Sequence, residues 1–506
     1  MRCVVLGATG YLGTRLVPQL LSEGHEVRVM ARQPAKLDDV PWRHHVEVVE
    51  GDVTDCAQVR VALDEQQVLY YLVHSLLRPD FVDLDAQAAS TVASVAGATG
   101  LSRIVYVGGL IPHQQKLSAH LASREEVGRL FLESGVATVE LRAAAIIGAG
   151  SASFEILRYL TERLPLMVTP RWLRTNIQPI AVRDVLYYLT KAAELPPEVN
   201  RAFDIGGPDT FTYTEMIRKY AAIAGLHRRI AIPVPVLTPW LSSHWVNLIT
   251  PIPRALAVSL MESLENDVVC GDHDIAQYIP DPPGGLTHFE DAVELALACA
   301  RDGELRTRWF RPDGNESPAR PLPTDPLWAG GSLHEHVCER HVRADRETLW
   351  RVVESIGAEH GWSAAPPAWA LRGWIGSIAG AAGVGPARRH PHRLHSGEVL
   401  DWWRVEHIDR LTLVRLRADI PLPGRLWLEL SVHADGNGGS VYRQRALFQP
   451  YGLGGQVFWA ASALWRDALF GGIARDIAAA AAGRNGLPRE DIQPVLADRR
   501  TAHFDA

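Results

Sequence analysis

Two side chains able to polarise an oxygen stand four residues apart in LSAHLASREEVG, residues 117 to 128. They are His120 and Arg124. Residues four apart share one face of a helix, so a single ligand can meet both side chains. Arginine keeps its proton, and its charge is expected to lower the pKa of the neighbouring histidine. We therefore expect a neutral imidazole beside a permanent cation, able to hold or polarise an oxygen but a poor general acid at neutral pH.

A glycine turn near the N-terminus indicates what is held nearby. The stretch CVVLGATGYLGTRLVPQLLSEGHEVRVMAR reads as strand, turn, helix and strand, with Gly7, Gly10 and Gly13 at GxxGxxG spacing. Gly7 permits a tight turn, Gly10 lets the backbone approach a pyrophosphate, and Gly13 lets the helix pack against the strand. The helix N-terminus adds free N–H groups for the phosphates. This context predicts dinucleotide binding; a purely architectural turn is the alternative.

The ends of the next two strands bear on which dinucleotide is bound. The second strand, EVRVMAR, ends at Arg32, where an NAD-binding unit usually has an acidic residue for the ribose 2′-hydroxyl. An arginine suits a 2′-phosphate and favours NADP, with NAD as the alternative. The third strand, VEVVEGDVTD, brings Asp52 and Val53 to the expected position of the adenine ring.

The order of the motifs resembles the extended and atypical short-chain dehydrogenase/reductase superfamily. GATGYLG, EGDVTD, VLYYLVHSL, SRIVYVGGL and IQPIAVRDV follow one another as in that superfamily, over residues 1 to about 300. The chain looks most similar to its NmrA-like and complex-I-subunit-like branches, which hold reductases as well as proteins that only sense or carry a nucleotide. The resemblance implies an α/β fold, a Rossmann doubly wound parallel sheet with a substrate lobe, over residues 1–310.

The residues at the usual catalytic positions depart from the superfamily. Its active members have a serine after the fifth strand and a YxxxK helix, in which tyrosine gives a proton and lysine lowers its pKa. Here Gly108 and Gly109 stand in place of the serine, His120 in place of the tyrosine and Arg124 in place of the lysine. Loss of acid catalysis costs roughly 10²- to 10⁴-fold, which an enone or quinone tolerates better than a simple ketone.

These residues predict an NADPH-dependent oxidoreductase acting on an apolar, activated small molecule, with His120 and Arg124 as candidate catalytic residues. The alternative is a non-catalytic NADP(H)-binding redox or ligand sensor, or an assembly protein. A lipid or polyketide carrier with a structural cofactor is a third reading. The residues expected to line the cofactor are Gly7, Thr9, Gly10, Tyr11, Leu12, Gly13, Arg32, Asp52, Val53, Val73, His74, Ser75 and Gly108.

Composition restricts the partners and the compartment. Hydrophobic residues make up 47% and charged residues 22% of the 506, as in folded domains, and a net charge of −7 gives no reason to expect nucleic acid. Five cysteines without a CxxC pair indicate a reducing compartment, taken as the cytoplasm. No signal peptide and no membrane span are expected. The apolar, proline-rich stretch 230–260 leaves peripheral membrane contact open.

The second half reads as a separate domain. Residues 311–332 have the composition of a linker, and residues 491–506 are expected to be a tail. Between them, residues 333–490 give a strand, a helix, four antiparallel strands and a long helix. That order resembles an α+β helix-grip, START-like domain, of a kind found behind atypical short-chain dehydrogenases in bacteria. Aromatic residues that would line a cavity there, or fill the core, are Trp402, Trp403, Trp427, Phe458, Trp459 and Trp465.

Two local patterns give further predictions. The histidine clusters HEHVCERH (334–341) and HPHRLH (390–395) do not match a known ligand spacing, so no metal site is expected. In IQPIAVRDV, Asp184 is expected to be the N-cap of a helix that begins at Val185.

Overall fold

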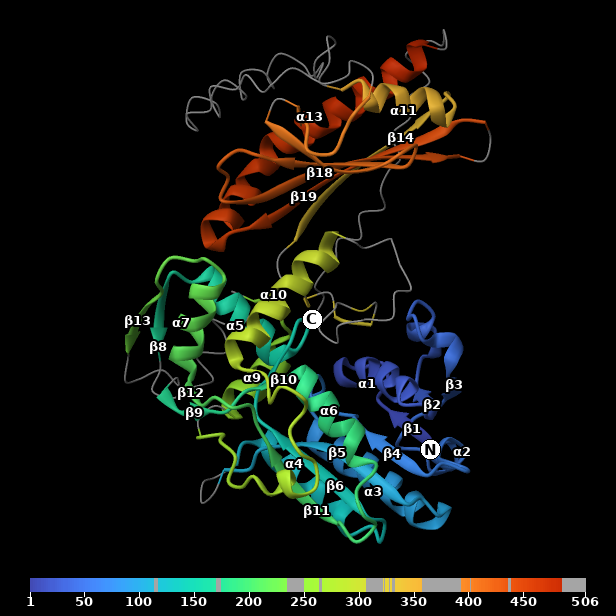
Figure 1. Ribbon diagram of the computed structural model, residues 1–506, viewed down its shortest axis with the longest axis vertical. Helices are drawn as coiled ribbons and strands as arrows, with labels where there is room; N and C mark the ends of the chain where they lie inside the picture. The colour runs from blue at the N-terminus through green and yellow to red at the C-terminus, as the bar shows by residue number, and fades with distance from the viewer. Residues whose placement is uncertain are drawn as a thin grey trace. The chain divides into compact units, whose positions relative to one another are not determined.

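The computed structural model describes residues 1–112, 117–169, 174–233, 250–263, 266–305, 322, 324–326, 328–329, 333–356, 393–400, 402–435 and 438–484. The chain divides into two compact units, Met1–Gly331 and Ser332–Ala506 (Figure 1). The described residues of the predicted linker, all between 322 and 329, therefore belong to the first unit.

A seven-stranded parallel sheet forms the centre of the first unit and confirms the predicted fold class. Its strands run in the order β11-β6-β5-β4-β1-β2-β3, so the direction of winding reverses between β1 and β4. Doubly wound sheets bind their ligands at such a reversal, beyond the carboxyl ends of the strands. The strands are β1 (Arg2–Leu6), β2 (Glu26–Ala31), β3 (Glu47–Glu50), β4 (Val68–Tyr71), β5 (Arg103–Gly109), β6 (Thr138–Ala143) and β11 (Arg201–Ile205).

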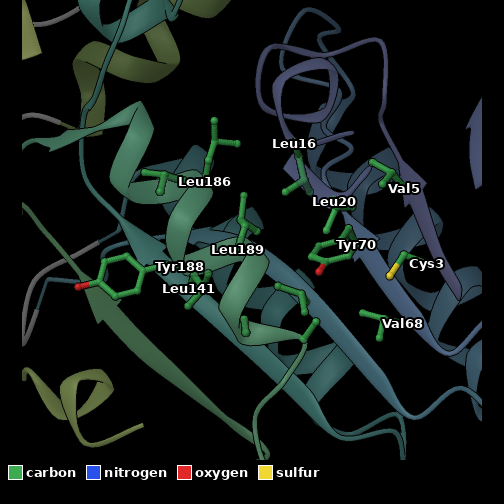
Figure 2. Packing of buried hydrophobic residues seen from close by; sticks show 14 of the residues in the cluster. Cys3, Val5, Leu16, Leu20, Val68, Tyr70, Leu141, Leu186, Tyr188 and Leu189 are labelled. Carbon is green, nitrogen blue, oxygen red and sulfur yellow. The ribbon is translucent and has the colours of Figure 1, made fainter. Parts of the chain in front are cut away.

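Helices cover both faces of this sheet because its strands are apolar on both sides. Residues alternate along β1: Cys3 and Val5 join the core under α1 (Tyr11–Ser22) and α6 (Val182–Ala192), whereas Val4 and Leu6 join the opposite core. Figure 2 shows Leu16 and Leu20 of α1 beside Leu186 and Leu189 of α6 above the sheet. Each such buried leucine stabilises the fold by about 1.5–3 kcal/mol. The opposite face carries α2 (Cys56–Leu63), α3 (Phe81–Thr99) and α4 (Ala119–Leu132).

The remaining helices of the first unit form a lobe with its own core. Phe154, Tyr213 and Tyr220 are buried there among aliphatic side chains. The lobe contains α5 (Ala152–Arg163), α7 (Tyr213–Ile223), α9 (Arg254–Ser263), α10 (Phe289–Leu305) and the strand pairs β7 (Ile146–Ile147) with β10 (Ile180–Ala181), β8 (Leu166–Thr169) with β13 (Ile230–Pro233), and β9 (Asn176–Ile177) with β12 (Phe211–Thr212). Short 3₁₀ turns are Pro34–Leu37, Arg43–His45 and Asp274–Gln277.

Two predictions concern membranes, one on a spanning helix and one on peripheral contact. No helix in the described part of the chain is long and apolar enough to cross a bilayer. Most of the stretch 230–260, on which peripheral membrane contact was predicted, lies outside the described residues.

The prediction for Asp184 is wrong. Helix α6 begins three residues earlier than Val185, with Ala181 as its N-cap, and Asp184 lies in the first turn. Its buried carboxylate accepts hydrogen bonds from Thr287 N at 2.7 Å and Thr287 Oγ1 at 3.0 Å. Asp184 thus satisfies a backbone donor of a distant segment, and the short strand β10 runs straight into the helix.

The second unit is an antiparallel sheet with helices. Its six strands run in the order β14-β19-β18-β17-β16-β15. The predicted first strand and long helix are confirmed, but the first of the four predicted antiparallel strands is divided into the antiparallel pair β15 and β16. Trp403, Trp427 and Trp459 are buried, while Trp402 and Phe458 pack against the core. The elements are β14 (His334–Val342), α11 (Arg346–Glu354), β15 (Val399–Leu400), β16 (Trp403–Asp409), β17 (Leu413–Ala418), β18 (Gly424–Ala434), β19 (Ser440–Pro450) and α13 (Gly452–Arg484).

His334 and His336 of β14 take part in packing against α13, whereas His341 is exposed. His334 stacks on Trp459 with ring centroids 5.5 Å apart, and His336 Nε2 lies 2.8 Å from Asp467 Oδ1. His390 and His392 lie outside the described residues. Among the residues that are described, no group of three or more side chains has the arrangement of a metal site.

Candidate functional site

The glycine turn between β1 and α1 is built by close backbone contacts. Gly7 has φ +93°, and a Cβ there would lie 2.6 Å from the carbonyl oxygen of Leu72, the residue after strand β4. A Cβ on Gly13 would overlap the carbonyl oxygen of Gly7. Thr14 Oγ1 donates to Ala8 O at 2.7 Å and ties the helix to the turn. The roles predicted for Gly7 and Gly13 follow directly from this geometry.

Gly10 leaves the space that a phosphate needs. A Cβ on Gly10 would meet only Gly7 O, at 3.2 Å, and the residue is exposed. As N-cap of α1 it has no side chain to occupy the free N–H groups of the first turn. These groups and the helix dipole fit the pyrophosphate of a dinucleotide. Thr9, Tyr11 and Leu12 are half-buried around the same turn.

Arg32 and Asp52 follow neighbouring strands at the adenosine end of the turn. Arg32, directly after β2, is exposed, and its charge acts on Asp52. Partial burial opposes ionisation of Asp52, but hydrogen bonds from Thr54 and the charge of Arg32 lower its pKa overall. Asp52 Oδ1 accepts from Thr54 N at 2.9 Å, so its carboxylate fixes the loop. Val53 packs against the core beside it.

Val73, His74 and Ser75 follow β4, at the same edge of the sheet. His74 is exposed, but the surrounding protein displaces much of the water that would hydrate its imidazole. This desolvation, together with the positive charge of Arg124, lowers the pKa of His74 to about 3. The imidazole is therefore neutral at physiological pH.

Gly108, predicted to line the cofactor, lies beside a buried glutamate. A Cβ there would lie 2.5 Å from Oε1 of Glu140, and a Cβ on Gly128 of α4 would lie 2.6 Å from the same carboxylate. The two glycines therefore make room for a buried glutamate, which Arg142 contacts at 3.0 Å. It is Gly109 that faces α4, where its Cβ would meet Leu121.

His120 and Arg124 lie on α4, as predicted, and act on each other electrostatically. Burial chiefly lowers the pKa of His120 to about 3, and the charges of Arg124 and His74 act in the same direction. The predicted direction is thus confirmed, although burial outweighs Arg124 as its cause. His120 Nδ1 lies 3.0 Å from Ser263 Oγ, at the end of α9. The site consequently holds two neutral imidazoles beside one guanidinium.

Arg124 is embedded in a polar network that sequence reasoning missed. Burial opposes its charge, but Tyr106 and Asp85 raise the pKa of Arg124 overall. Asp85 of α3 is only 3% exposed, and burial raises the pKa of its carboxyl despite Arg124 and hydrogen bonds from Ser75. The one available signal was an aspartate among the alanines and valines of α3. Tyr106 Oη donates to Arg124 O at 3.3 Å, and Arg124 Cγ would lie 3.9 Å from a Cβ on Gly109 at the end of β5.

A second missed feature lies beside the glycine turn. Asp325 contacts Arg15 of α1 at 2.8 and 2.7 Å, and the two side chains are 5% and 1% exposed. Arg15 also donates to Ala149 O at 3.3 Å and lies over the ring of Tyr11 at 4.1 Å. Thr324 Oγ1 donates to Thr14 Oγ1 at 3.0 Å, and Tyr159 donates to Trp328 O at 2.9 Å. We call residues 322–329 the docking segment.

Comparison with protein families agrees with this architecture. Residues 7–148 match a family described as NAD(P)H-binding. Residues 328–471 match a family described as a protein of unknown function (DUF2867). The first match covers the glycine turn, strands β2 to β6 and helix α4, so the chain binds NAD(P).

Three curated relatives are similar to this chain over more than half of its length. A ceramide reductase of Caulobacter vibrioides is 28% identical over 311 residues, which cover 58% of this chain and 94% of the relative. The photosystem II assembly factor Ycf39 of Trieres chinensis is 22% identical over 299 residues, 58% and 91% of the two chains. A mitochondrial NADH dehydrogenase [ubiquinone] 1 alpha subcomplex subunit 9 of Arabidopsis thaliana is 23% identical over 284 residues, 53% and 71%. The chain is thus similar over part of its length to proteins named as a reductase, an assembly factor and an NADH dehydrogenase subunit.

Proposed function

We propose that the first unit is an NADPH-dependent reductase of a hydrophobic, lipid-like substrate with a carbonyl or similarly activated acceptor. The observation that carries this proposal is the position of Arg124. Arg124 lies beside Gly109 at the end of β5, its backbone oxygen accepts from Tyr106, and Tyr106 and Asp85 favour its charge. The relative named ceramide reductase, aligned over 94% of its length, supports a lipid-like substrate.

In the proposed reaction, Arg124 and the two histidines have different roles. Bound NADPH supplies a hydride to the acceptor carbon. Arg124 stabilises the negative charge that develops on the acceptor oxygen, in a setting where fixed donors act strongly. His74 and His120, whose pKa values are both lowered to about 3, are not imidazolium acids at neutral pH. The alkoxide therefore takes its proton from water, which favours acceptors that stabilise negative charge themselves.

Arg32 supports the preference for NADPH over NADH. It is exposed directly after β2, its charge reaches Asp52, and no hydrogen bond within the described part of the chain engages its guanidinium. A charged, bidentate donor at this place suits a ribose 2′-phosphate.

Replacing Arg124 with methionine tests the proposal. NADPH oxidation by the full chain is followed with long-chain ketones, enones and quinones, and the variant is expected to lose about 10²- to 10³-fold in kcat. Arg129→Met is the matched control, because Arg129 lies on the same helix but is exposed and pairs with Glu126 and Glu133. Equal activity of both variants would contradict the assigned role of Arg124.

A non-catalytic NADP(H) sensor or assembly protein is the second candidate. It is favoured by the changes at all three usual catalytic positions and by the relative named as an assembly factor. Single-turnover experiments with stoichiometric NADPH discriminate the two. A sensor binds both cofactor forms and oxidises NADPH with none of the acceptors.

For the second unit we propose the helix-grip, START-like assignment. It is supported by the antiparallel order β14-β19-β18-β17-β16-β15 and by the packing of α13 against β14 and β19. A role in receiving an apolar ligand is tested by native mass spectrometry of the full chain after incubation with long-chain fatty acids. Absence of any bound fatty acid would count against that role.

A further inference from the structure

The hydrogen bonds around Ser263 determine which nitrogen of His120 carries the proton. Ser263 Oγ lies 3.0 Å from Ser259 O, 3.1 Å from Ser118 Oγ and 3.0 Å from His120 Nδ1. A hydroxyl donates one hydrogen bond and accepts two. A carbonyl oxygen can only accept, so satisfying all three contacts requires Ser263 to donate to Ser259 and to accept from the other two. His120 therefore bears its proton on Nδ1.

This tautomer leaves a lone pair on Nε2. The ring is neutral, since the pKa of His120 is lowered to about 3. Among the described residues, no hydrogen bond engages Nε2. The nearby charge, that of Arg124, is shared with Tyr106 and Asp85. The edge of His120 opposite Ser263 therefore presents a hydrogen-bond acceptor. The tyrosine hydroxyl of the usual YxxxK helix does the reverse, because it gives a proton to the substrate.

We propose that His120 Nε2 accepts a hydrogen bond from an N–H or O–H group of the substrate next to its reacting carbonyl, and that Ser263 is the positioning residue that fixes this tautomer. The inference rests on the proposed reductase function and narrows its substrate to long-chain α-hydroxy or α-amido ketones. A simple ketone of the same length would leave the acceptor unpaired, which costs about tenfold in affinity.

Binding measurements test this without depending on turnover. The full chain, saturated with NADP, is titrated by calorimetry with three probes of equal chain length: an α-hydroxy ketone, an α-acetamido ketone and the plain ketone. At least one donor-bearing probe is expected to bind about tenfold tighter than the plain ketone, and the one that does identifies the donor. The preference should fall in Ser263→Ala and persist in Ser263→Thr, which keeps the hydroxyl.

Ser259→Ala is the matched control on the same helix. Its hydroxyl donates to Ala255 O, so the substitution spares the Ser259 carbonyl that Ser263 uses. Nitrogen NMR of the histidine-labelled chain, with His120 assigned through His120→Gln, should show the Nδ1–H tautomer in the wild type and in Ser259→Ala. A loss of that tautomer is expected in Ser263→Ala.

Several results would overturn the inference. Equal binding of the three probes, or no binding of any, removes the donor preference. A preference that survives in Ser263→Ala removes Ser263 from the positioning role. If Ser263→Ala weakens NADP and all three probes alike, the lone pair meets a ribose hydroxyl instead of the substrate. By contrast, a binding preference without NADPH oxidation would refute the reductase proposal, and only the assignment of His120 Nε2 as a hydrogen-bond acceptor for a bound ligand would stand.

Discussion

Removing the carboxylate of Asp325 is expected to destabilise the first unit by about 3–5 kcal/mol, the usual cost of leaving a buried charge without its partner. The pair it forms with Arg15 is bidentate and nearly inaccessible to solvent. In Asp325→Ala, Arg15 keeps hydrogen bonds to Tyr11 O and Ala149 O and its place over the Tyr11 ring. We therefore expect a loss at the lower end of that range.

A double-mutant cycle separates the pair from the packing around it. Arg15→Met and Asp325→Leu each break the pair, whereas the double variant removes both charges and is expected to recover much of the loss. Urea titration of the full chain is combined with hydrogen exchange of peptides covering α1, so that the readout reports on this unit. Arg201 and Asp274, paired at 3.0 Å but 43% and 41% exposed, provide the control, for which a loss of about 0–1 kcal/mol is expected.

The result that refutes the reasoning is a loss below about 1 kcal/mol in Asp325→Ala, because that value belongs to a solvated pair. A normal stability with unchanged exchange in α1 would mean that the docking segment does not restrain the helix that carries the glycine turn.

Three further predictions concern the nucleotide site. Gly10→Ala should fold normally but lose NADPH binding by calorimetry, because its Cβ enters the phosphate space; Gly13→Ala should also lose about 1–3 kcal/mol in urea titration, since its Cβ overlaps Gly7 O. Equal stability of the two variants would contradict this. The pKa of His120 is lowered to about 3 in the folded chain, so its contribution to stability is complete above about pH 6.5. That contribution falls as the pH drops toward 3, by about 2 kcal/mol at pH 5; His120→Gln should flatten the dependence of the urea midpoint on pH, and an unchanged slope would refute it. Arg32→Ala should weaken NADPH about 10- to 100-fold with NADH as the unaffected control; parallel losses for both cofactors would rule out contact with a 2′-phosphate.

The features predictable from sequence were those encoded locally. The glycine spacing fixed the turn because Gly7 and Gly13 are needed within one short segment, and alternation along β1 revealed a strand covered on both faces. Contacts between distant segments left no such trace. Asp325 lies 310 residues from Arg15 in a stretch whose composition indicated a linker, and only the fold brings them together.

The same reason explains the error at Asp184 and the missed partner of His120. An aspartate just before an apolar helical pattern normally caps that helix. The carboxylate of Asp184 instead accepts hydrogen bonds from Thr287, 103 residues away. Ser263 lies 143 residues from His120, so nothing in LSAHLASREEVG could reveal the tautomer.

The buried carboxylate of Glu140 has an evolutionary consequence. Positions 108, 128 and 140 come from two strands and a helix, yet they share one volume, in which a methyl group at either glycine would collide with the glutamate. A larger residue at position 108 or 128 is therefore tolerated only after Glu140 has been replaced by a smaller residue, so the substitutions must occur in that order. A serine at position 108 is therefore compatible only with a chain in which Glu140 has first been replaced by a smaller residue.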